Sequence, residues 1–488
     1  MPTKPYSFVI LMLFWLLLVA ACNNNVAFIP MATTPVLQPT STAAAATAPL
    51  TATTPVTTMT AVTPSVAMTS TTPITTTTTV TTAAALTTTT PITTVNDGQA
   101  GAILQAELVE TVTMTEINRL SAGFYPASNL VDARYAVAIY RLTVQSSDET
   151  GAPIALQTDL YLPQVARATT FPVLAYAPGT TGLGDGCAPS QEYPLGRQWG
   201  SYRTHMLSYA GQGLIGVLPD GMSYRDPDRP HEYFIGELEA HTLLDAARAA
   251  YGFLAQPPAA VNVRAQAALF FAGYSNGGHT AFAAKDFAAD YAPELPLRGV
   301  ISHGATTSVE ALLRESPIFT PYLIYAYRHF FGADVIGPEQ VFLDDWLPTF
   351  DEDVLTLCVD DIFVRYTNDP QGMYRPEFRT ALFNDTLGES YPLFKAVIDA
   401  NYAGTFGGFD IPAAFFQGTA DYVVTPDAQQ RFATLLCEQG EPVTYVTLPA
   451  VQHVNTRQVS FKATIAWIQR IAKGQKPQNH CAQIGAGE

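Results

Sequence analysis

Residues 268–278 of the chain read ALFFAGYSNGG, an apolar run followed by the pattern Gly-x-Ser-x-Gly. Five apolar residues without alternation are typical of a strand that is buried on both faces of a parallel sheet. The residues after the pattern have helical periodicity. A serine between such a strand and such a helix lies on a sharp turn, where small neighbours leave its hydroxyl exposed. The stretch therefore predicts a strand–turn–helix unit with Ser275 as a candidate nucleophile.

The chain around this unit alternates strand and helix patterns. We expect strands at residues 135–144, 155–162, 171–177, 214–218, 299–302, 413–417 and 443–448, and helices at 236–254, 279–291, 427–437 and 461–473. This alternation is typical of an α/β fold with a mostly parallel, doubly wound sheet. The 392 residues from Asp97 onward exceed what one compact core usually holds. We therefore interpret the aromatic-rich residues 305–408, between two strand candidates, as an inserted helical cap.

A nucleophilic serine needs a base that takes its proton and an acid that orients the base. Where such a serine follows a strand of a doubly wound sheet, the chain order is serine, acid, histidine. Asp421 follows the strand expected at 413–417, and His453 follows the strand expected at 443–448. Both lie beyond the carboxyl ends of strands, where these folds assemble their sites. We expect Asp421 to be the acid and His453 the base.

Other acids and histidines fit these roles less well. Asp427 is typical of the first turn of a helix, and Asp410 precedes its strand, at the wrong end of the sheet. His303 follows a strand and is the main rival base, but it comes before the acid in the chain. His279 lies just inside the helix after Ser275, and we expect it to face the surface of that helix.

Catalysis at an ester or amide carbonyl also needs an oxyanion hole, in which backbone N–H groups point at the developing negative charge. One expected donor is the amide of Asn276, directly after Ser275. The second is expected in residues 178–185, PGTTGLGD, where glycines let the backbone approach a substrate. A simple surface turn would contain the same residues. The sequence leaves Thr180 and Thr181 as equal candidates.

Charge is distributed unevenly along the chain. No charged residue occurs between Lys4 and Asp97, so residues 97–488 hold 66 of the 67 charged side chains and a net charge of −18. Nucleic-acid binding requires clustered Lys and Arg, and this acidic excess therefore argues against a nucleic-acid partner. It favours a neutral or apolar small molecule over an anionic one.

The amino-terminal residues have the composition of an export signal. Residues 8–21 are almost wholly apolar but fall short of the roughly 20 residues that span a bilayer, which predicts a signal peptide. The residues Leu-Val-Ala-Ala before Cys22 resemble a bacterial lipobox, so we expect lipidation of Cys22 and a membrane anchor. A conventional signal peptide or an uncleaved anchor are the alternatives.

The domain organisation follows from these patterns. Residues 23–100, rich in Thr, Pro and Ala, cannot bury enough apolar surface to fold and are predicted to form a disordered stalk. We divide the chain into a signal segment with Cys22 (1–22), this stalk (23–100), a first part of the α/β core (101–304), the cap (305–408) and a second part of the core (409–488).

Four cysteines remain once Cys22 is assigned to lipid, namely Cys187, Cys358, Cys437 and Cys481. An even number in an exported domain predicts two disulfides, for which three connectivities exist. None of the four has Cys-x-x-Cys spacing, so we expect no zinc site and no cofactor.

Taken together, these residues resemble the α/β-hydrolase superfamily and, more narrowly, its secretory lipase family, which includes the Candida antarctica lipase A type. The broader resemblance rests on Gly273–Gly277, on Gly-Thr-Ala-Asp at 418–421 and on His453. The narrower one rests on residues 179–190 (GTTGLGDGCAPS), 231–240 (HEYFIGELEA) and 245–250 (DAARAA), and it covers roughly residues 110 to 475.

The resemblance implies a helical cap between strands 6 and 7 of the sheet and ester hydrolysis by Ser275, Asp421 and His453. It also implies two disulfides, Cys187 with Cys358 and Cys437 with Cys481. Two stretches differ from the family pattern. Pro-Gly at 178–179 replaces the usual His-Gly of the oxyanion loop, and residues 220–226 replace a glycine-rich loop.

These observations lead us to expect an exported, lipid-anchored hydrolase of carboxylic esters, a lipase or esterase that works through an acyl-enzyme. The aromatic-rich cap favours an apolar acyl or alcohol group. A serine peptidase of the same fold is an alternative, although no acidic pair for a peptide amino terminus is evident. A non-catalytic surface binding module is a third interpretation, and a complete set of site residues in the right order argues against it.

Overall fold

The computed structural model of the protein describes residues 99–224, 226 and 228–484. The expected signal peptide, Cys22 and nearly all of the expected stalk lie outside the described residues. Among the residues that are described, no helix is both long and apolar enough to cross a membrane.

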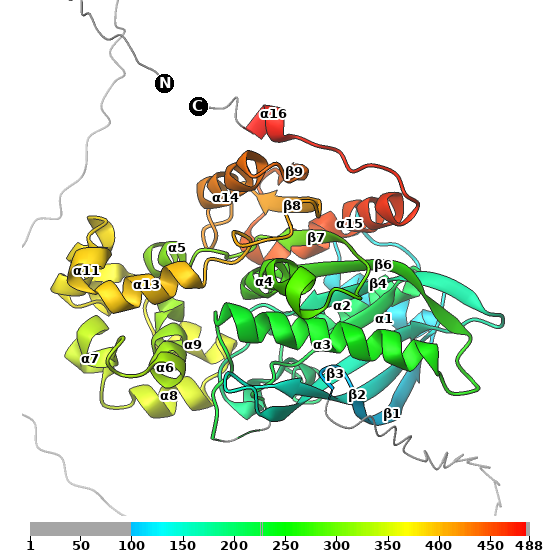
Figure 1. Ribbon diagram of the computed structural model, residues 1–488, viewed down its shortest axis with the longest axis horizontal. Coiled ribbons are helices and arrows are strands. Elements are labelled where there is room, and N and C mark those ends of the chain that lie inside the picture. Colours follow the sequence, from blue (N-terminus) through cyan, green and yellow to red (C-terminus); the bar gives the residue numbers. More distant parts are fainter. Residues whose placement is uncertain (1–98, 225, 227, 485–488) are drawn as a thin grey trace, which may run out of the picture. The chain divides into compact units, whose positions relative to one another are not determined.

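Nine strands form a single sheet in the order β1-β2-β3-β5-β4-β6-β7-β8-β9 (Figure 1). The strands are β1 (Ile103–Val112), β2 (Val137–Ser147), β3 (Pro153–Pro163), β4 (Thr169–Ala177), β5 (Ile215–Pro219), β6 (Val263–Tyr274), β7 (Leu297–His303), β8 (Ala413–Gly418) and β9 (Val443–Leu448). β1, β2, β3 and β5 pair in antiparallel fashion, and the remaining pairs are parallel. The predicted α/β-hydrolase fold is confirmed.

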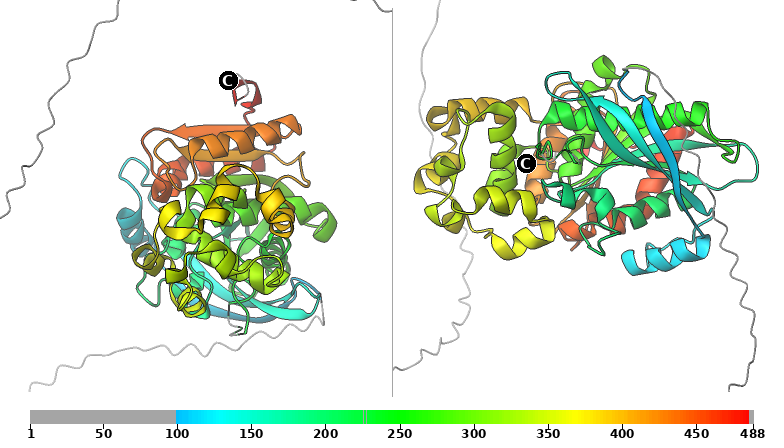
Figure 2. Two further views of the ribbon diagram at one scale, coloured as in Figure 1. Left: turned by 90° about the vertical axis from the view of Figure 1, so that its left-hand side faces the viewer. Right: turned by 90° about the horizontal axis from the view of Figure 1, so that it is seen from below.

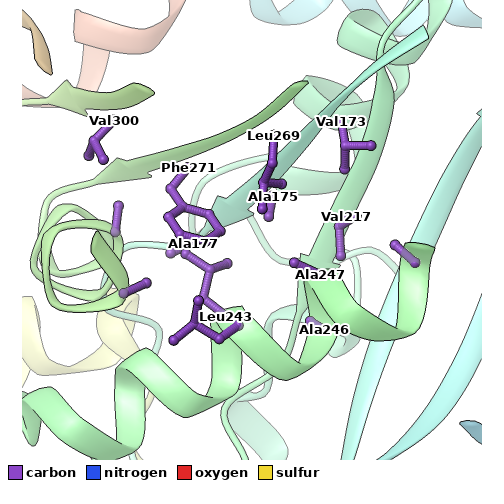
Figure 3. Close-up of a cluster of buried hydrophobic side chains, with 14 of the residues drawn as sticks. Val173, Ala175, Ala177, Val217, Leu243, Ala246, Ala247, Leu269, Phe271 and Val300 are labelled. Carbon is purple, nitrogen blue, oxygen red and sulfur yellow. The ribbon is translucent and has the colours of Figure 1, made fainter. Parts of the chain in front are cut away.

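Helices cover both faces of this sheet. They are α1 (Met114–Phe124), α2 (Tyr202–Gly211), α3 (Gly236–Ala255), α4 (Asn276–Tyr291), α14 (Pro426–Glu438), α15 (Thr456–Ala472) and the short α16 (Cys481–Ile484). α3, α4 and α14 share one apolar core with the sheet, and α1, α2 and α15 share a second core on the other face. Figure 3 shows small side chains of α3, Ala246 and Ala247, beside valines, alanines and the ring of Phe271 on the central strands.

The chain between β7 and β8 forms the helical cap. Its helices are α5 (Val309–Glu315), α6 (Thr320–Phe331), α7 (Pro338–Val341), α8 (Phe350–Thr356), α9 (Val359–Arg365), α10 (Pro370–Met373), α11 (Pro376–Phe383), α12 (Leu387–Ser390) and α13 (Pro392–Ala400). They lie together beside the sheet (Figure 2) and enclose an apolar core of their own. That core also takes up Leu183, Tyr233, Phe234 and Leu238 from the main body, so it holds the cap against the loops that follow β4 and β5.

Outside the cap, four of the described strands and α-helices are not predicted by the sequence patterns: β1, α1, α2 and the short α16. β1 is an edge strand with mostly exposed side chains and therefore has no apolar run. α2 is buried over most of its surface and therefore shows no amphipathic period, and the short α1 was also not predicted. Because β1 adds a strand, the cap lies between β7 and β8, which are the sixth and seventh of the predicted strands.

Two disulfides join distant parts of the chain. Cys187 is bonded to Cys358 across 171 residues, and Cys437 to Cys481 across 44 residues. These are the pairs that the family resemblance implies. The first connects the loop after β4 to the start of α9 in the cap, and the second connects α14 to α16.

Candidate active site

Ser275 lies on a sharp turn between β6 and α4, with φ 56° and ψ −122°. Backbone dihedrals of this kind are strained for a residue with a side chain, and they persist only where the surroundings enforce them. A Cβ on Gly273 would lie 1.8 Å from the carbonyl oxygen of Gly277, and a Cβ on Gly277 would lie 2.1 Å from that of Ala177. The turn around Ser275 therefore requires both glycines of the predicted motif.

Asp421 and His453 meet beyond the ends of β8 and β9. His453 Nδ1 lies 2.9 Å from Asp421 Oδ2. The other carboxylate oxygen, Oδ1, accepts the main-chain N–H groups of Val423 and Val424 at 3.0 and 2.9 Å. These two bonds fix the carboxylate so that it can orient the imidazole.

The loop after β7 connects this pair to the serine. The carbonyl of His303, the last residue of β7, accepts the N–H of Ser275 at 3.3 Å, and the N–H of Thr306 in the loop donates to the Ser275 carbonyl at 3.0 Å. Between them, a Cβ on Gly304 would lie 3.1 Å from Asp421 Oδ2 and 3.2 Å from His453 Nδ1. The structure thus brings the predicted nucleophile, acid and base to one edge of the sheet.

No hydrogen bond joins Ser275 to His453, both of which are described. Hydrogen bonds between a nucleophile and its base are often long until a substrate is bound. The ring of Tyr274, directly before Ser275, lies 4.8 Å from the His453 ring, centroid to centroid. The candidate base thus contacts the residue that precedes the candidate nucleophile.

Two of the expected oxyanion donors, Asn276 and Thr181, line one small cavity. Asn276 is the first residue of α4, so its N–H has no acceptor within the helix. Gly179, Thr181 and Asn276 all line a cavity of about 30 Å³. The Gly179 N–H already donates to the Tyr202 hydroxyl at 2.8 Å, which leaves Thr180 and Thr181 as the candidates for the second donor.

These two threonines are held differently. The Thr180 hydroxyl lies 2.7 Å from that of Tyr233. The Thr181 hydroxyl lies 3.1 Å from that of Tyr224, and its carbonyl accepts the N–H of Val359, the first residue of α9, at 2.8 Å. The predicted oxyanion loop is thus hydrogen-bonded directly to the cap.

The rival residues are engaged elsewhere. His303 is buried, and its Nε2 lies 3.1 Å from the Thr464 hydroxyl. Burial, reinforced by the charge of Arg457, lowers the pKa of His303 to about 3, so it is a poor base. Asp427 lies in the first turn of α14 as predicted, after the capping residue Thr425.

The prediction for His279 is wrong. Its ring is completely buried, with Nδ1 2.5 Å from Glu239 Oε2 and Nε2 2.7 Å from the Asn401 carbonyl oxygen. The helix that carries His279 packs on the sheet with one face and on α3 and the end of the cap with the other. Helical position alone therefore does not show which residues are exposed.

A buried arginine near His453 was also not predicted. Arg457 is the second residue of α15 and is 2% exposed. Its guanidinium lies 4.1 Å from the ring centre of Tyr274 and 5.0 Å from that of Tyr202. Tyr274 contacts His453, and Tyr202 receives the Gly179 N–H. The cation thus supports both sides of the candidate site, and its position four residues after His453 was the only signal in the sequence.

Residues 204–316, from within α2 to the end of α5, match the model of a family described as secretory lipase. The chain has the α/β-hydrolase fold, and this stretch of it, which contains Ser275, is similar to the secretory lipase family. No curated protein sequence matches this hydrolase. The family match and the fold identify it as a carboxylic-ester hydrolase. The match to a secretory family and the two disulfides are typical of an extracellular protein.

Three solved structures illustrate the likeness of the hydrolase fold. A ligand-bound form of the rice cell wall degrading esterase LipA from Xanthomonas oryzae has a TM-score of 0.62 and 18% identity, over 78% of this chain and 100% of that chain. A putative hydrolase from Legionella pneumophila gives 0.63 and 16%, over 77% and 100%. Candida antarctica lipase A gives 0.56 and 17%, over 79% and 84%.

Proposed function

We propose that this hydrolase cleaves neutral or apolar carboxylic esters through an acyl-enzyme formed on Ser275. The observation that carries the proposal is the 2.9 Å contact between His453 and Asp421 beside a serine in a strained turn. Such a turn persists only where the structure enforces it, and reactive nucleophiles are commonly held in this way.

The proposed reaction has two halves. The Ser275 hydroxyl attacks the ester carbonyl while His453 Nε2 takes its proton, and Asp421 accepts the Nδ1–H bond and stabilises the imidazolium. The N–H of Asn276 and one from Thr180 or Thr181 stabilise the tetrahedral alkoxide. His453 then gives its proton to the leaving alcohol, and water attacks the acyl-enzyme by the same route in reverse.

Apolar side chains near the site support an apolar substrate group. Tyr422 and Val454, directly after the candidate acid and base, are both more than half exposed. In the cap, Phe363 and Val364 of α9 are 55% and 89% exposed, and α9 begins at the residue that binds the oxyanion loop. The charge of the folded part, −18, disfavours anionic esters.

The test of this proposal is the release of p-nitrophenol from acyl esters of two to sixteen carbons. We expect Ser275→Ala to lower kcat by at least about a thousandfold, because the nucleophile is lost. Ser121→Ala is the matched control, since Ser121 is also buried but bonds only to Ser208, between α1 and α2. Unchanged activity in Ser275→Ala would remove this serine from the reaction, and no hydrolysis of any ester would favour a binding module.

We further propose that the hydrolase is exported and anchored to a membrane through a lipid on Cys22, with residues 23–100 as a stalk. The support is the lipobox-like sequence before Cys22 and a Thr/Pro/Ala composition that does not fold. A fatty-acid probe should label the wild-type protein in its native host but not Cys22→Ser. Equal labelling of the two proteins would contradict the anchor.

A further inference from the structure

Glu239 of α3 is a buried carboxylate with four hydrogen-bond donors. Its Oε1 accepts the side-chain amide of Asn276 and the N–H of Phe234, each at 2.9 Å. Its Oε2 faces His279 Nδ1 at 2.5 Å and accepts the hydroxyl of Thr280 at 3.1 Å. Three of these four partners belong to the first turns of α4, immediately after Ser275. Neither Glu239 nor His279 has a part in the reaction described above.

We infer that Glu239 and His279 form a buried pair of positioning residues that holds Asn276, and with it the oxyanion donor, in place for catalysis. The inference rests on the proposed function, because it concerns the amide that is proposed to stabilise the alkoxide.

The protons of this pair follow from its hydrogen bonds. His279 Nε2 lies 2.7 Å from the Asn401 carbonyl oxygen, which only accepts, so Nε2 carries a proton. A second proton lies between Nδ1 and Glu239 Oε2, on one atom or the other. In either case Glu239 and His279 are together electrically neutral. That neutrality explains why both side chains can be buried, with exposures of 1% and 0%.

The pair connects three parts of the molecule. Glu239 lies on α3, His279 on α4, and Asn401 follows α13, the last helix of the cap. Asn401 also accepts the N–H of Gly236, the first residue of α3, through its side-chain oxygen at 2.7 Å. A displacement of the cap at this point would therefore be transmitted to the first turn of α4.

Glu239 also reaches the second side of the proposed oxyanion hole. It lines the cavity of about 30 Å³ that Gly179, Thr181 and Asn276 share. A cavity of this size with polar walls has room for one water molecule. The carboxylate is thus bonded to one proposed donor residue and adjoins the loop that supplies the other.

Many buried ion pairs serve only the fold, and kinetics separates that role from the one inferred here. An oxyanion donor acts on the transition state and hardly on the bound substrate, so its misplacement lowers kcat and leaves KM unchanged. Complete loss of a donor costs about 10²- to 10³-fold in kcat. A donor that is present but poorly held should cost less, roughly ten- to a hundredfold.

Glu239→Gln is the decisive variant, because glutamine keeps the shape of the side chain but has only one acceptor oxygen, so it cannot accept from the partners of both carboxylate oxygens. We expect kcat to fall roughly ten- to a hundredfold with KM within about twofold of wild type. Asp245→Asn is the matched control on the same helix. Asp245 is also buried and accepts bonds from Ser146 and Tyr291, far along α3 from the pair. It should lower the melting temperature without changing kcat or KM.

Asn276→Ala provides an independent test, since it keeps the backbone N–H and removes only the amide held by Glu239. It should also lower kcat at constant KM, and the double variant with Glu239→Gln should be no worse than the poorer single variant. Three results would each overturn the inference. The first is a wild-type kcat in Glu239→Gln, and the second is additive losses of kcat in the double variant. The third is a loss of kcat that follows the melting temperature in Asp245→Asn as well. If Ser275→Ala is inactive in the same assay, any of these results leaves the proposed function intact.

Discussion

Gly304 shows how closely the backbone approaches the reacting groups. It has φ +59°, and it lies between the two loops that carry the candidate acid and base. A side chain at this position would meet Asp421 and His453 at 3.1 to 3.2 Å, closer than ordinary van der Waals contact. Glycine is therefore needed here for space as well as for its backbone conformation.

We expect Gly304→Ala to lower kcat at least tenfold, because the new methyl group displaces the carboxylate or the imidazole. Gly440→Ala is its control, since Gly440 has φ +86° and a Cβ added there would meet no atom within 4 Å. Both variants should lose roughly 1 kcal/mol of stability through backbone strain, and only Gly304→Ala should lose activity. Chemical denaturation and ester hydrolysis measure the two effects separately, and equal kinetics in both variants would contradict this account.

At the scale of elements, Glu232 fastens the loop after β5 to α3. Its carboxylate accepts the N–H of Met222 at 2.9 Å and the hydroxyl of Thr242 at 2.8 Å, and lies 3.2 Å from His231 Nδ1. Burial alone would raise the pKa of Glu232, but the charge and hydrogen bond of His231 outweigh it and lower this pKa to about 2. Burial alone would lower the pKa of His231, but the charge and hydrogen bond of Glu232, together with the charges of Glu239 and Asp220, outweigh it and raise this pKa.

From these shifts we predict that the contribution of this pair to the free energy of unfolding is largest in mildly acidic solution. A lowered pKa for Glu232 stabilises the fold above about pH 4.5, and that contribution is lost as the pH falls toward 2. A raised pKa for His231 stabilises the fold below about pH 6.5 and loses its effect as the pH rises through the folded-state value. The difference in unfolding free energy between wild type and Glu232→Gln should therefore peak between about pH 4.5 and 6.5.

Urea denaturation at pH 3, 5.5 and 8.5 checks this prediction. The expected difference at pH 5.5 is on the order of 3 kcal/mol, with smaller values at both other pH values. A difference that is independent of pH would show that the hydrogen bonds of Glu232, and not its charge, hold the loop.

Strands buried on both faces were predictable from the sequence, and the edge strand β1 was not. The apolar runs of β4, β6, β7 and β8 are typical of strands in a parallel sheet that is covered on both faces. They correctly predicted the strands that precede Ser275 and Asp421. β1 lacks such a run because one of its edges and most of its side chains face solvent.

Buried charged residues were missed for a related reason. Glu239, His279 and Arg457 have the composition of a solvated helix face, and only the packing of α3, α4 and α15 encloses them. Apart from Phe234, which lies five residues before Glu239, the hydrogen-bond partners named here are 37 to 257 residues away in the chain, so no local sequence pattern indicates them. The sequence motifs therefore predict the candidate catalytic residues, but they do not predict the buried residues that position them.

At the scale of the whole molecule, the two disulfides connect different parts of the fold. Cys187–Cys358 joins the loop after β4 to the cap beside the hydrogen bond from Val359 to Thr181. Cys437–Cys481 ties the carboxyl-terminal segment to α14, away from the site. Both close loops in the unfolded chain and should stabilise the fold by about 2 to 5 kcal/mol each.

We expect removal of the first disulfide, by Cys187→Ala with Cys358→Ala, to lower both the melting temperature and kcat/KM. Removal of the second, by Cys437→Ala with Cys481→Ala, should lower only the melting temperature. Assays well below both melting temperatures make the comparison fair. Equal kinetic losses in the two variants would show that the first disulfide has no special relation to the site.

The cap leaves the sheet after β7 and returns to it at β8, and these two strands are direct neighbours, with Val300 opposite Ala413. Because the two strands are parallel, the inserted chain leaves at the carboxyl end of β7 and re-enters the sheet at the amino end of β8, without separating these two neighbours. Its length and sequence can change over evolutionary time without disturbing a single strand pairing. During evolution the sheet can keep its catalytic residues while a changed cap alters the substrate specificity. In the same way, caps can be exchanged between related proteins at the connections to β7 and β8.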